Sequence, residues 1–290
     1  MRLDDFDPRS INVSDQRGGG FPVGMRGGSI GCGTLVIALI GALVFGIDPT
    51  QMLGGIDQTQ QQTSAPAGNT GGASVAESCS VDAVSRETCN ALSSLNKTWA
   101  QIFAKSSIAF VQPKLVFYSQ MGRSGCGTAQ SAMGPFYCPA DQGIYIDTEF
   151  YNELDQRLGA KGNFARAYVV AHEFGHHVQK LTGLADQVRS AQEQNSSSAN
   201  PLQVRMELQA DCYAGVWAAH NKDRIEPGDI EEGLNAAHSI GDDTLMKSAG
   251  RRPVEAAFTH GSSAQRVEWL RKGLESGNED DCDTFADLRK

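Results

Sequence analysis

The feature that most constrains this chain is the pentapeptide His172-Glu173-Phe174-Gly175-His176, which lies inside an uninterrupted helical pattern. Residues four apart share one face of a helix, so the two imidazoles should project side by side. Two such imidazoles can bind one metal ion, and the carboxylate between them can take a proton from a metal-bound water. Catalytic zinc sites use three protein ligands plus water, so the pattern predicts a third ligand elsewhere in the chain.

A second predicted helix can supply that ligand, because it carries Glu207 and Asp211 four residues apart on one face. Two histidines and a glutamate are a known ligand set for catalytic zinc. We therefore expect His172, His176 and Glu207 to bind one Zn²⁺ ion, with Glu173 as the general base. Asp211 should accept a hydrogen bond from the second ring nitrogen of His172. An ordinary helix with two solvated acids is the competing interpretation.

A further candidate group is Thr259-His260-Gly261 with Arg266. Peptide hydrolysis passes through a tetrahedral oxyanion, which a hydrogen-bond donor besides the metal can stabilise. His260 stands just before a predicted helix and is a candidate for this donor. Arg266 would then pair with Glu207 or Asp211. A loop histidine and a solvated arginine are the alternative.

The other histidines are not expected to bind the metal. His177 lies about 100° around the helix from His176, so the two side chains point in different directions. His220 and His238 sit on helical patterns with no partner acid at a useful spacing. We interpret all three as ordinary structural or surface histidines.

The pentapeptide followed by Glu207-x-x-x-Asp211 is the pattern of gluzincin-type metallopeptidases, and the wider sequence resembles the bacterial YpfJ-like neutral zinc metallopeptidase family. The resemblance covers most of the chain from about Ser78 onward, through residues 134–139, 144–147, 163–181, 207–215 and 258–270. The Thr-His…Arg grouping is similar to one near the active site of other membrane-linked HExxH peptidases. The resemblance implies a membrane-tethered zinc metallopeptidase and gives no physiological substrate.

An uncharged stretch over residues 27–47 is long and apolar enough to cross a bilayer as a helix. A cleaved signal peptide is the closest alternative, but its charged lead is usually short, and here twenty-eight residues precede residue 29, where the anchor is predicted to begin. We therefore predict a transmembrane signal anchor over residues 29–47, with the lipid bilayer as a partner. The net charge of −9 argues against nucleic acid as a partner, because phosphate binding needs a concentrated basic face.

The distribution of basic residues predicts the orientation of this span. Arg2, Arg9, Arg17 and Arg26 precede it, and the next basic residue is Arg86. The positive-inside rule then places the N-terminus in the cytoplasm and the catalytic domain in the periplasm or outside the cell. We expect a single-pass protein of a bacterial cytoplasmic (inner) membrane.

Four parts of the chain follow from these patterns. Residues 1–28 have few apolar side chains and are predicted to be a disordered cytoplasmic leader, followed by the anchor over 29–47. Residues 48–76, rich in Gln, Thr, Ser, Gly and Ala, read as a flexible linker. Residues 77–290 form the zinc metallopeptidase domain.

Cysteine usage agrees with a domain outside the cytoplasm. Cys32 falls in the predicted span, and an even set of six cysteines follows it, which is typical of an oxidising compartment. Six cysteines allow fifteen pairings. Sequence proximity favours Cys79–Cys89, Cys126–Cys138 and Cys212–Cys282. A structural zinc site is the alternative, although no CxxC pair supports it.

The order of predicted elements is helix, strands, helices. Short strands are expected over 114–118 and 142–147, and helices over 89–105, 163–181, 201–220, 230–240 and 264–274. The predicted fold class is α+β: a mainly helical zincin-like metallopeptidase domain with a small β-sheet, preceded by a single transmembrane helix.

The chain is therefore expected to be a zinc metallopeptidase, more an endopeptidase than an exopeptidase, that hydrolyses peptide bonds outside the cytoplasmic membrane. Its substrate, a protein or peptide, would pair with the strand containing Ile144 and Ile146 as an added edge. Phe136, Tyr137 and Tyr213 are candidate walls of a specificity pocket. Two other classes remain open, a membrane-anchored zinc-containing scaffold or binding protein and a metal-dependent hydrolase of a cell-wall amide.

Overall fold

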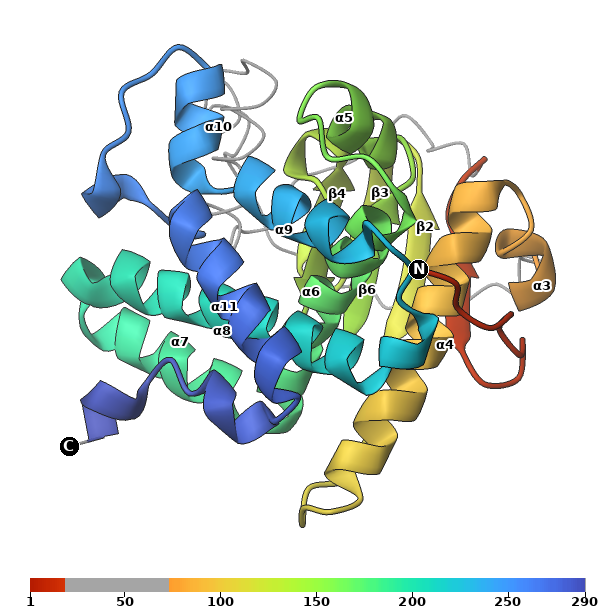
Figure 1. The fold of residues 1–290 in the computed structure, drawn as a ribbon, viewed down its shortest axis with the longest axis horizontal. Helices are drawn as coiled ribbons and strands as arrows, with labels where there is room; N and C mark the ends of the chain where they lie inside the picture. The colour runs from red at the N-terminus through yellow and green to blue at the C-terminus, as the bar shows by residue number, and fades with distance from the viewer. Residues whose placement is uncertain (19–72, 290) are drawn as a thin grey trace, which may run out of the picture.

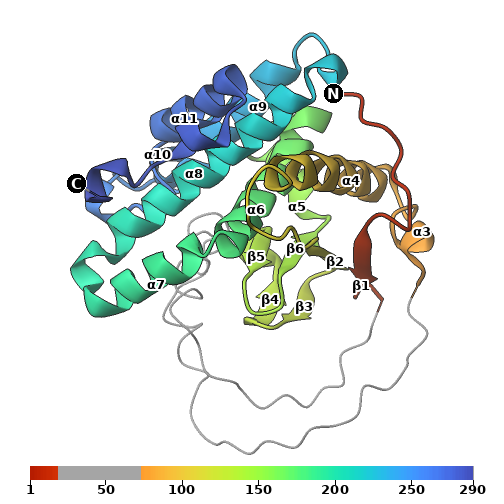
Figure 2. The ribbon, with the colours of Figure 1, turned by 90° about the horizontal axis from the view of Figure 1, so that it is seen from below.

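In the computed structural model, which describes residues 1–18 and 73–289, the predicted helix around the histidine pair is α6 (Asn163–Leu181). It packs against the strands and α4 (Ala83–Phe103), and also against α8 (Ala199–His220) and α9 (Asp229–Ser239). Figures 1 and 2 show α6 between the strands and the pair formed by α8 and α11 (Ser263–Ser276). Its core position explains why apolar residues occur around most of its circumference.

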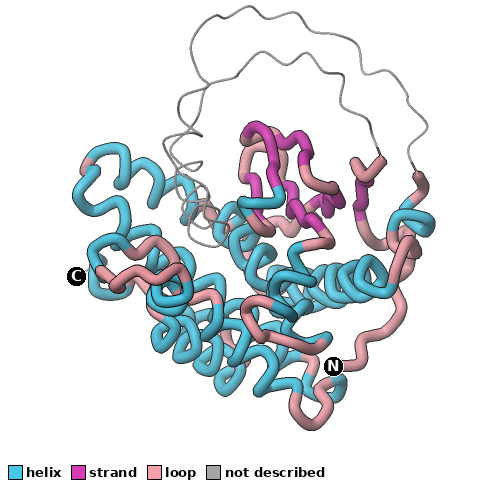
Figure 3. Tube along the Cα trace, turned by 90° about the horizontal axis from the view of Figure 1, so that it is seen from above, coloured by secondary structure: helices cyan, strands magenta, loops and turns pink. Residues whose placement is uncertain are grey.

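The main sheet has four strands in the order β1 (Asn12–Asp15), β2 (Lys114–Tyr118), β6 (Gly143–Asp147) and β5 (Phe136–Cys138). The first three run parallel and β5 is antiparallel to β6. A separate hairpin pairs β3 (Met121–Ser124) with β4 (Gly127–Gln130). In Figure 3 all strands gather on one side of the molecule. The predicted α+β class with a small sheet is confirmed for the described residues.

The position of β6 corrects one expectation. Ile144 pairs with Leu115 of β2 on one side and with Tyr137 of β5 on the other. A strand with neighbours on both sides has no free backbone groups to offer a peptide. Over residues 143–145, where β5 pairs with it, β6 is therefore an interior strand, and the edge of the sheet at this end is β5. Ile146 pairs with Phe117 of β2 and lies beyond the residues that β5 covers.

The structure also corrects the expected disorder of the leader, for residues 1–18. Asn12 lies opposite Lys114 and Asp15 opposite Phe117, so β1 extends the sheet as a parallel edge strand. Ile11 is buried in the same core. One row of strand hydrogen bonds and a few apolar anchors thus order a segment whose composition alone indicates disorder.

The side chain of Arg17 secures the end of this leader. Its guanidinium donates to Ser85 Oγ at 2.7 Å and to the Ser78 carbonyl oxygen at 2.8 Å. It also lies 4.4 Å from the centre of the Phe117 ring, a cation–π contact. Residues 1–17 and the domain that follows residue 73 therefore pack into one body.

Four further α-helices are described, namely α3 (Val75–Ser78), α5 (Phe150–Gln156), α7 (Leu184–Gln194) and α10 (Asp242–Ser248). Of these, α7 packs against α6 and α8, α10 against α9 and α11, and α3 against β1. Ser74 caps α3, so the ordered domain begins slightly before the predicted residue 77. The crossing of α8 and α11 depends on Gly215, because a Cβ there would clash with the main chain of Leu270.

The three favoured disulfides are present. They join Cys79 to Cys89, Cys126 to Cys138 and Cys212 to Cys282. The third ties a short turn, η5 (Glu279–Cys282), to the middle of α8. Cys32 lies outside the described residues.

The predicted membrane span falls in the part of the chain that the structure does not describe. Residues 29–47 belong to the undescribed stretch 19–72. Among residues 1–18 and 73–289, no helix has the length and apolar character needed to cross a bilayer.

Candidate metal centre

Two helices build the candidate metal centre. α6 supplies His172, Glu173 and His176, and α8 supplies Glu207. The helices approach closely at Gly175, where a Cβ would lie 2.8 Å from the Cα of Ala210. Glycine at this position therefore allows the glutamate of one helix to reach the histidines of the other.

The three candidate ligands face a common point. Their nearest nitrogen and oxygen atoms, from His172, His176 and Glu207, lie within 4.8 Å of one another. Oε2 of Glu207 is 3.1 Å from Nε2 of His172 and 3.6 Å from Nε2 of His176. Ligand atoms held at about 2.1 Å from zinc in a tetrahedron are about 3.4 Å apart, so the spacing fits one zinc ion. The predicted ligands are thus close enough to bind a metal.

Glu173 lies beside this cluster in a nearly dry environment, with 7% of its surface exposed. Burial raises the pKa of its carboxyl, and the positive charges of His172 and His176 only partly oppose this effect. A carboxylate whose pKa is raised toward neutrality accepts a proton more readily than an ordinary solvent-exposed glutamate.

His172 has charged surroundings. Its Nδ1 lies 2.7 Å from Asp211 Oδ1, as the sequence predicts for this pair. Arg266 donates to both oxygens of Asp211, at 2.8 and 3.0 Å, and the Tyr168 hydroxyl donates to Oδ1 at 2.6 Å. Of the two expected partners for Arg266, the structure selects Asp211. These four side chains form an ionic cluster in the interior.

In this ionic cluster, burial opposes each charge, and neighbouring opposite charges outweigh that effect on the pKa. Burial opposes a charge on His172, but Asp211 and Glu207 outweigh it and raise its pKa to about 9. Burial likewise opposes the charge on Asp211, and Arg266 together with His172 lowers its pKa to about 2. Asp211 is therefore a carboxylate at all ordinary pH values and can accept a hydrogen bond from Nδ1–H of His172.

His176 has neutral surroundings at its second ring nitrogen. Nδ1 lies 2.9 Å from the amide oxygen of Gln179, three residues further along α6. Burial opposes a charge on His176, and the carboxylate of Glu207 outweighs it and raises the pKa. Burial in turn opposes the charge on Glu207, and the two imidazoles hold its pKa well below the ordinary value.

His260 is buried near the cluster and is held by a second aspartate. Asp242 Oδ1 lies 3.2 Å from Nδ1 of His260, and Oδ2 accepts the backbone N–H groups of Thr259, His260 and Gly261. This arrangement leaves Nε2 of His260 available. A charge on His260 lowers the pKa of Glu207, so the imidazole is within electrostatic range of the ligand cluster.

Three residues that the sequence analysis does not single out also contact the centre. Tyr168 stands four residues before His172 and Gln179 three residues after His176, so helical spacing offers a signal for both. Asp242 is eighteen residues from His260. The segment between α10 and α11 brings that pair together, and no local sequence spacing predicts this contact.

His177 faces away from the candidate ligands. Its Nε2 lies 2.7 Å from the Val111 carbonyl oxygen and its Nδ1 lies 3.0 Å from the Tyr137 hydroxyl. Burial lowers its pKa to about 4, so the ring is neutral. Both ring nitrogens have partners within the fold, which agrees with the predicted structural role.

Two of the three candidate pocket walls belong to the core. Phe136 stacks on Tyr145 with ring centres 4.9 Å apart, and Tyr213 packs against Trp99 at 5.3 Å. Each is less than a tenth exposed. Tyr137, bonded to His177, is the candidate that remains partly exposed next to α6.

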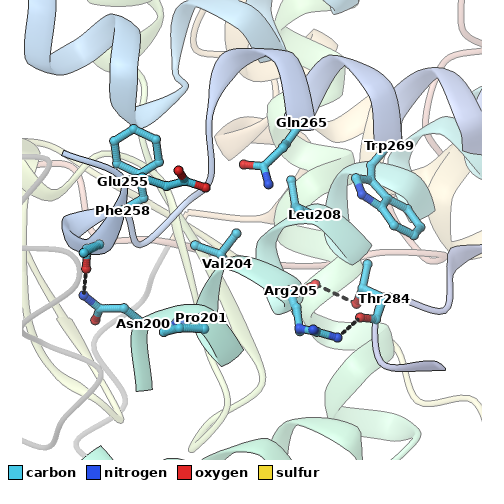
Figure 4. Close-up of a pocket in the computed structure, with 11 residues that line it drawn as sticks. Asn200, Pro201, Val204, Arg205, Leu208, Glu255, Phe258, Gln265, Trp269 and Thr284 are labelled. Atoms are coloured by element: carbon cyan, nitrogen blue, oxygen red, sulfur yellow. Dashed lines mark hydrogen bonds between the residues drawn. The ribbon is translucent and has the colours of Figure 1, made fainter. Parts of the chain in front are cut away.

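A cavity of about 600 Å³ lies beside α8, on a face next to the one that carries Glu207. Figure 4 shows Val204, Leu208, Gln265 and Trp269 pointing into it. None of the three candidate ligands lines this cavity. It is therefore a separate hollow between α8, α11 and the segment near Glu255.

Comparison with known proteins gives matches over nearly the whole chain. A family model described as "Putative neutral zinc metallopeptidase" matches residues 4–285, a span that includes the leader strand. An "Uncharacterized protein YpfJ" of Escherichia coli (strain K12) is 44% identical over 287 residues, 96% of this chain and 96% of the relative. An "Uncharacterized protein Rv2575" of Mycobacterium tuberculosis (strain ATCC 25618 / H37Rv) is 40% identical over 190 residues, 61% of this chain and 64% of the relative. No solved structure matches the chain.

Proposed function

This chain belongs to the neutral zinc metallopeptidase family, and we propose that it hydrolyses peptide bonds of proteins or peptides in a zinc-dependent reaction. The observation that carries the proposal is the convergence of His172, His176 and Glu207 with a buried Glu173 at their side. A purely structural zinc site has no use for a buried carboxylate that can act as a base.

In this proposal His172, His176 and Glu207 hold the zinc. A zinc ion with three protein ligands would polarise the scissile carbonyl and lower the pKa of its water to about 7. Glu173 takes the proton of the attacking water and then delivers it to the leaving amine. Its buried position favours this role, because the raised pKa lets the carboxyl both accept and return a proton.

Asp211 and Arg266 are proposed to position His172. Asp211 accepts a hydrogen bond from Nδ1–H of His172, which leaves the Nε2 lone pair of His172 for the metal. Arg266 holds Asp211 through two hydrogen bonds. His260 is proposed to act as an imidazolium: it donates from Nε2 to the developing oxyanion, while Asp242 accepts a hydrogen bond from its Nδ1.

The substrate is proposed to bind as an extended strand beside β5. This strand stands at the edge of the sheet and packs against α6. Its central residue, Tyr137, is bonded to His177, the residue after His176. A peptide that pairs with β5 would run beside α6, the helix that carries His172 and His176, while using backbone hydrogen bonds for recognition.

Replacing Glu173 by glutamine tests the function. We expect the full-length Glu173→Gln protein to keep one zinc per chain and to lose at least about 100-fold in the rate of peptide hydrolysis, because the general base is gone. Glu193→Gln on the surface of α7 is the matched control. Zinc content is measured by mass spectrometry, and hydrolysis with an unfolded protein, a folded protein and peptidoglycan as substrates.

Other results of that assay would favour the other classes. A wild-type protein that binds zinc but cleaves none of the substrates would be a scaffold or binding protein. Cleavage of peptidoglycan alone would make it a cell-wall amide hydrolase. Unchanged proteolysis by Glu173→Gln would contradict the proposed base.

The domain is proposed to work outside the cytoplasm, in an oxidising compartment. The three disulfides support this location, since such bonds persist there and are rare in the cytosol. The leader is proposed to lie on the same side of the membrane, because residues 1–17 pack directly on the domain. A single crossing within the undescribed stretch 19–72 would separate the two.

Cysteine labelling in intact cells tests this arrangement. Arg9 and Arg252 are exposed, one in the leader and one in the domain. In a Cys32→Ser background, in which the other six cysteines form disulfides, we expect a cysteine introduced at either position, Arg9→Cys or Arg252→Cys, to react with a membrane-impermeant maleimide. Labelling at position 252 alone would instead support the single-pass topology predicted from the sequence, with the N-terminus in the cytoplasm.

A further inference from the structure

The orientation of Gln179 is fixed by groups that can only accept hydrogen bonds. Its Nε2 donates to the carbonyl oxygen of Met206 at 2.8 Å and to Oε1 of Gln209 at 3.0 Å. A backbone carbonyl cannot donate, so the amide nitrogen must face Met206. The amide oxygen of Gln179 therefore faces His176 and can only accept from its ring.

The amide of Gln209 is also fixed in its orientation, by a residue that takes part in a disulfide bond. Gln209 donates from Nε2 to the carbonyl oxygen of Cys282 at 3.0 Å, which fixes the orientation of its amide in turn. Cys282 is bonded to Cys212, three residues after Gln209 on α8. Gln179 and Cys282 are fully buried, and Gln209 is 4% exposed. The chain of hydrogen bonds therefore has no direct competition from water.

We propose that this amide relay, from Cys282 through Gln209 and Gln179, positions His176 for metal binding. Because the oxygen of Gln179 accepts at Nδ1, the imidazole carries its proton there and presents the Nε2 lone pair to the metal. The relay rests on the proposed function in one respect, that His176 is a metal ligand. Gln179 acts through His176 and is a positioning residue.

The relay does for His176 what Asp211 does for His172, without a charge. A metal-bound histidine usually donates its other ring N–H to an acceptor, and loss of that acceptor typically weakens metal binding by about 10- to 100-fold. Methionine has nearly the shape of glutamine, but its thioether is only a weak acceptor for a hydrogen bond from Nδ1. Gln179→Met should therefore free the ring to rotate or change tautomer while the interior stays filled.

The test measures metal binding in three full-length variants. Gln179→Met removes the acceptor, Gln209→Met removes the second member of the relay, and Gln16→Met is the matched control. Gln16 also bonds through both ends of its amide to main-chain groups, those of Arg123, far from the metal centre. Zinc affinity is measured by competition with a chelator, and ligand geometry by the visible absorption spectrum of the Co²⁺-substituted protein.

We expect Gln179→Met to raise the zinc dissociation constant by about 10- to 100-fold and to change the cobalt spectrum. Gln209→Met should raise the constant by more than about twofold and less than about 10-fold, because Gln179 keeps its bond to Met206. Gln16→Met should match the wild type. The relay is overturned if Gln179→Met binds zinc within twofold of Gln16→Met and gives the same cobalt spectrum.

Two further provisions keep the test decisive. If Gln179→Met does not fold, Gln209→Met decides: values identical to those of Gln16→Met would overturn the relay. Neither readout is hydrolysis, so a wild type that binds zinc without cleaving peptides contradicts the proposed function and leaves the relay intact.

Discussion

The two histidines of the proposed zinc site stand four residues apart on one helix, yet their surroundings are opposite in kind. His172 rests on an ionic cluster in which Asp211 and Arg266 are fully or almost fully buried. His176 rests on the neutral amides of Gln179 and Gln209. Both arrangements leave Nε2 free toward the centre.

One helix can therefore carry two metal-facing imidazoles whose orientations are fixed by different kinds of partner, charged at His172 and neutral at His176. A buried ionic cluster is stable only when every charge has its partner, because a single unpaired charge in the interior is costly. A buried amide relay needs only complete hydrogen bonding. Changes in the ionic cluster should therefore threaten the fold, whereas changes in the relay should mainly affect the metal.

The largest effect is expected from Arg266→Met. This change removes the guanidinium that most strongly compensates the buried Asp211 carboxylate and leaves only the imidazole of His172 beside it, so we expect the free energy of unfolding to fall by about 3–5 kcal/mol. Urea denaturation of the metal-free protein measures it. Arg166→Met is the matched control, since Arg166 pairs with Glu87 at a site where the two side chains are 17% and 36% exposed. A surface pair of this kind contributes about 0–1 kcal/mol, so equal losses in the two variants would contradict the comparison.

The next effect concerns the covalent end of the amide relay. The double variant Cys212→Ser with Cys282→Ser opens a bridge between residues 70 apart, and we expect a loss of about 2–4 kcal/mol in unfolding free energy. Zinc affinity should fall as well, because the Cys282 carbonyl that holds Gln209 is released. Chelator competition and urea denaturation under non-reducing conditions measure both quantities.

Cys126→Ser with Cys138→Ser is the control for that double variant. It opens a bridge between residues 12 apart in the strand region and should also lower stability. Its zinc affinity should remain that of the wild type, since neither cysteine contacts the relay. A parallel fall in zinc affinity in both variants would show that stability alone governs metal binding.

Local periodicity explains how much of this centre could be read from the sequence. Residues four apart on a helix share a face, so the pentapeptide predicts the meeting of His172 and His176, and Glu207 with Asp211 predicts a second face. The bounds expected for α6 are those observed, Asn163–Leu181. The contact of Asp211 with His172 follows once the two helices are taken to pack on each other.

What could not be read depends on how distant segments meet. Asp242 reaches His260 because α10 turns back onto the start of α11, and no spacing in the sequence encodes that turn. Val13 and its neighbours in β1 look like a disordered tail until the exposed edge of β2 is known to be available. The interior position of Ile144 likewise depends on which strands flank β6, which periodicity alone does not determine.

The smallest expected effect on stability concerns Asp242. Like Asp211, it is a buried aspartate that bonds a histidine ring, and the comparison of these two aspartates extends to pH. Asp211 is compensated by Arg266, whereas Asp242 is surrounded by the backbone N–H groups of the loop at His260. Burial opposes the charge on Asp242, but its hydrogen bonds and the charge of His260 outweigh it and lower its pKa below 3.8. A carboxyl with a lowered pKa in the folded state stabilises the fold above its ordinary pKa, and this contribution is lost as the pH falls through the folded value.

Asp242→Asn should therefore cost about 1–2 kcal/mol of unfolding free energy at neutral pH, because charge-assisted hydrogen bonds become neutral ones. The difference from the wild type should shrink as the pH drops below 3.8, the ordinary value, because the carboxyl of the unfolded wild-type chain is protonated there first and that of the folded chain follows at a lower pH. Urea denaturation between pH 7 and pH 3 measures this convergence. A difference that stays constant over the whole range would mean that shape, and not the charge of Asp242, holds the loop that presents His260.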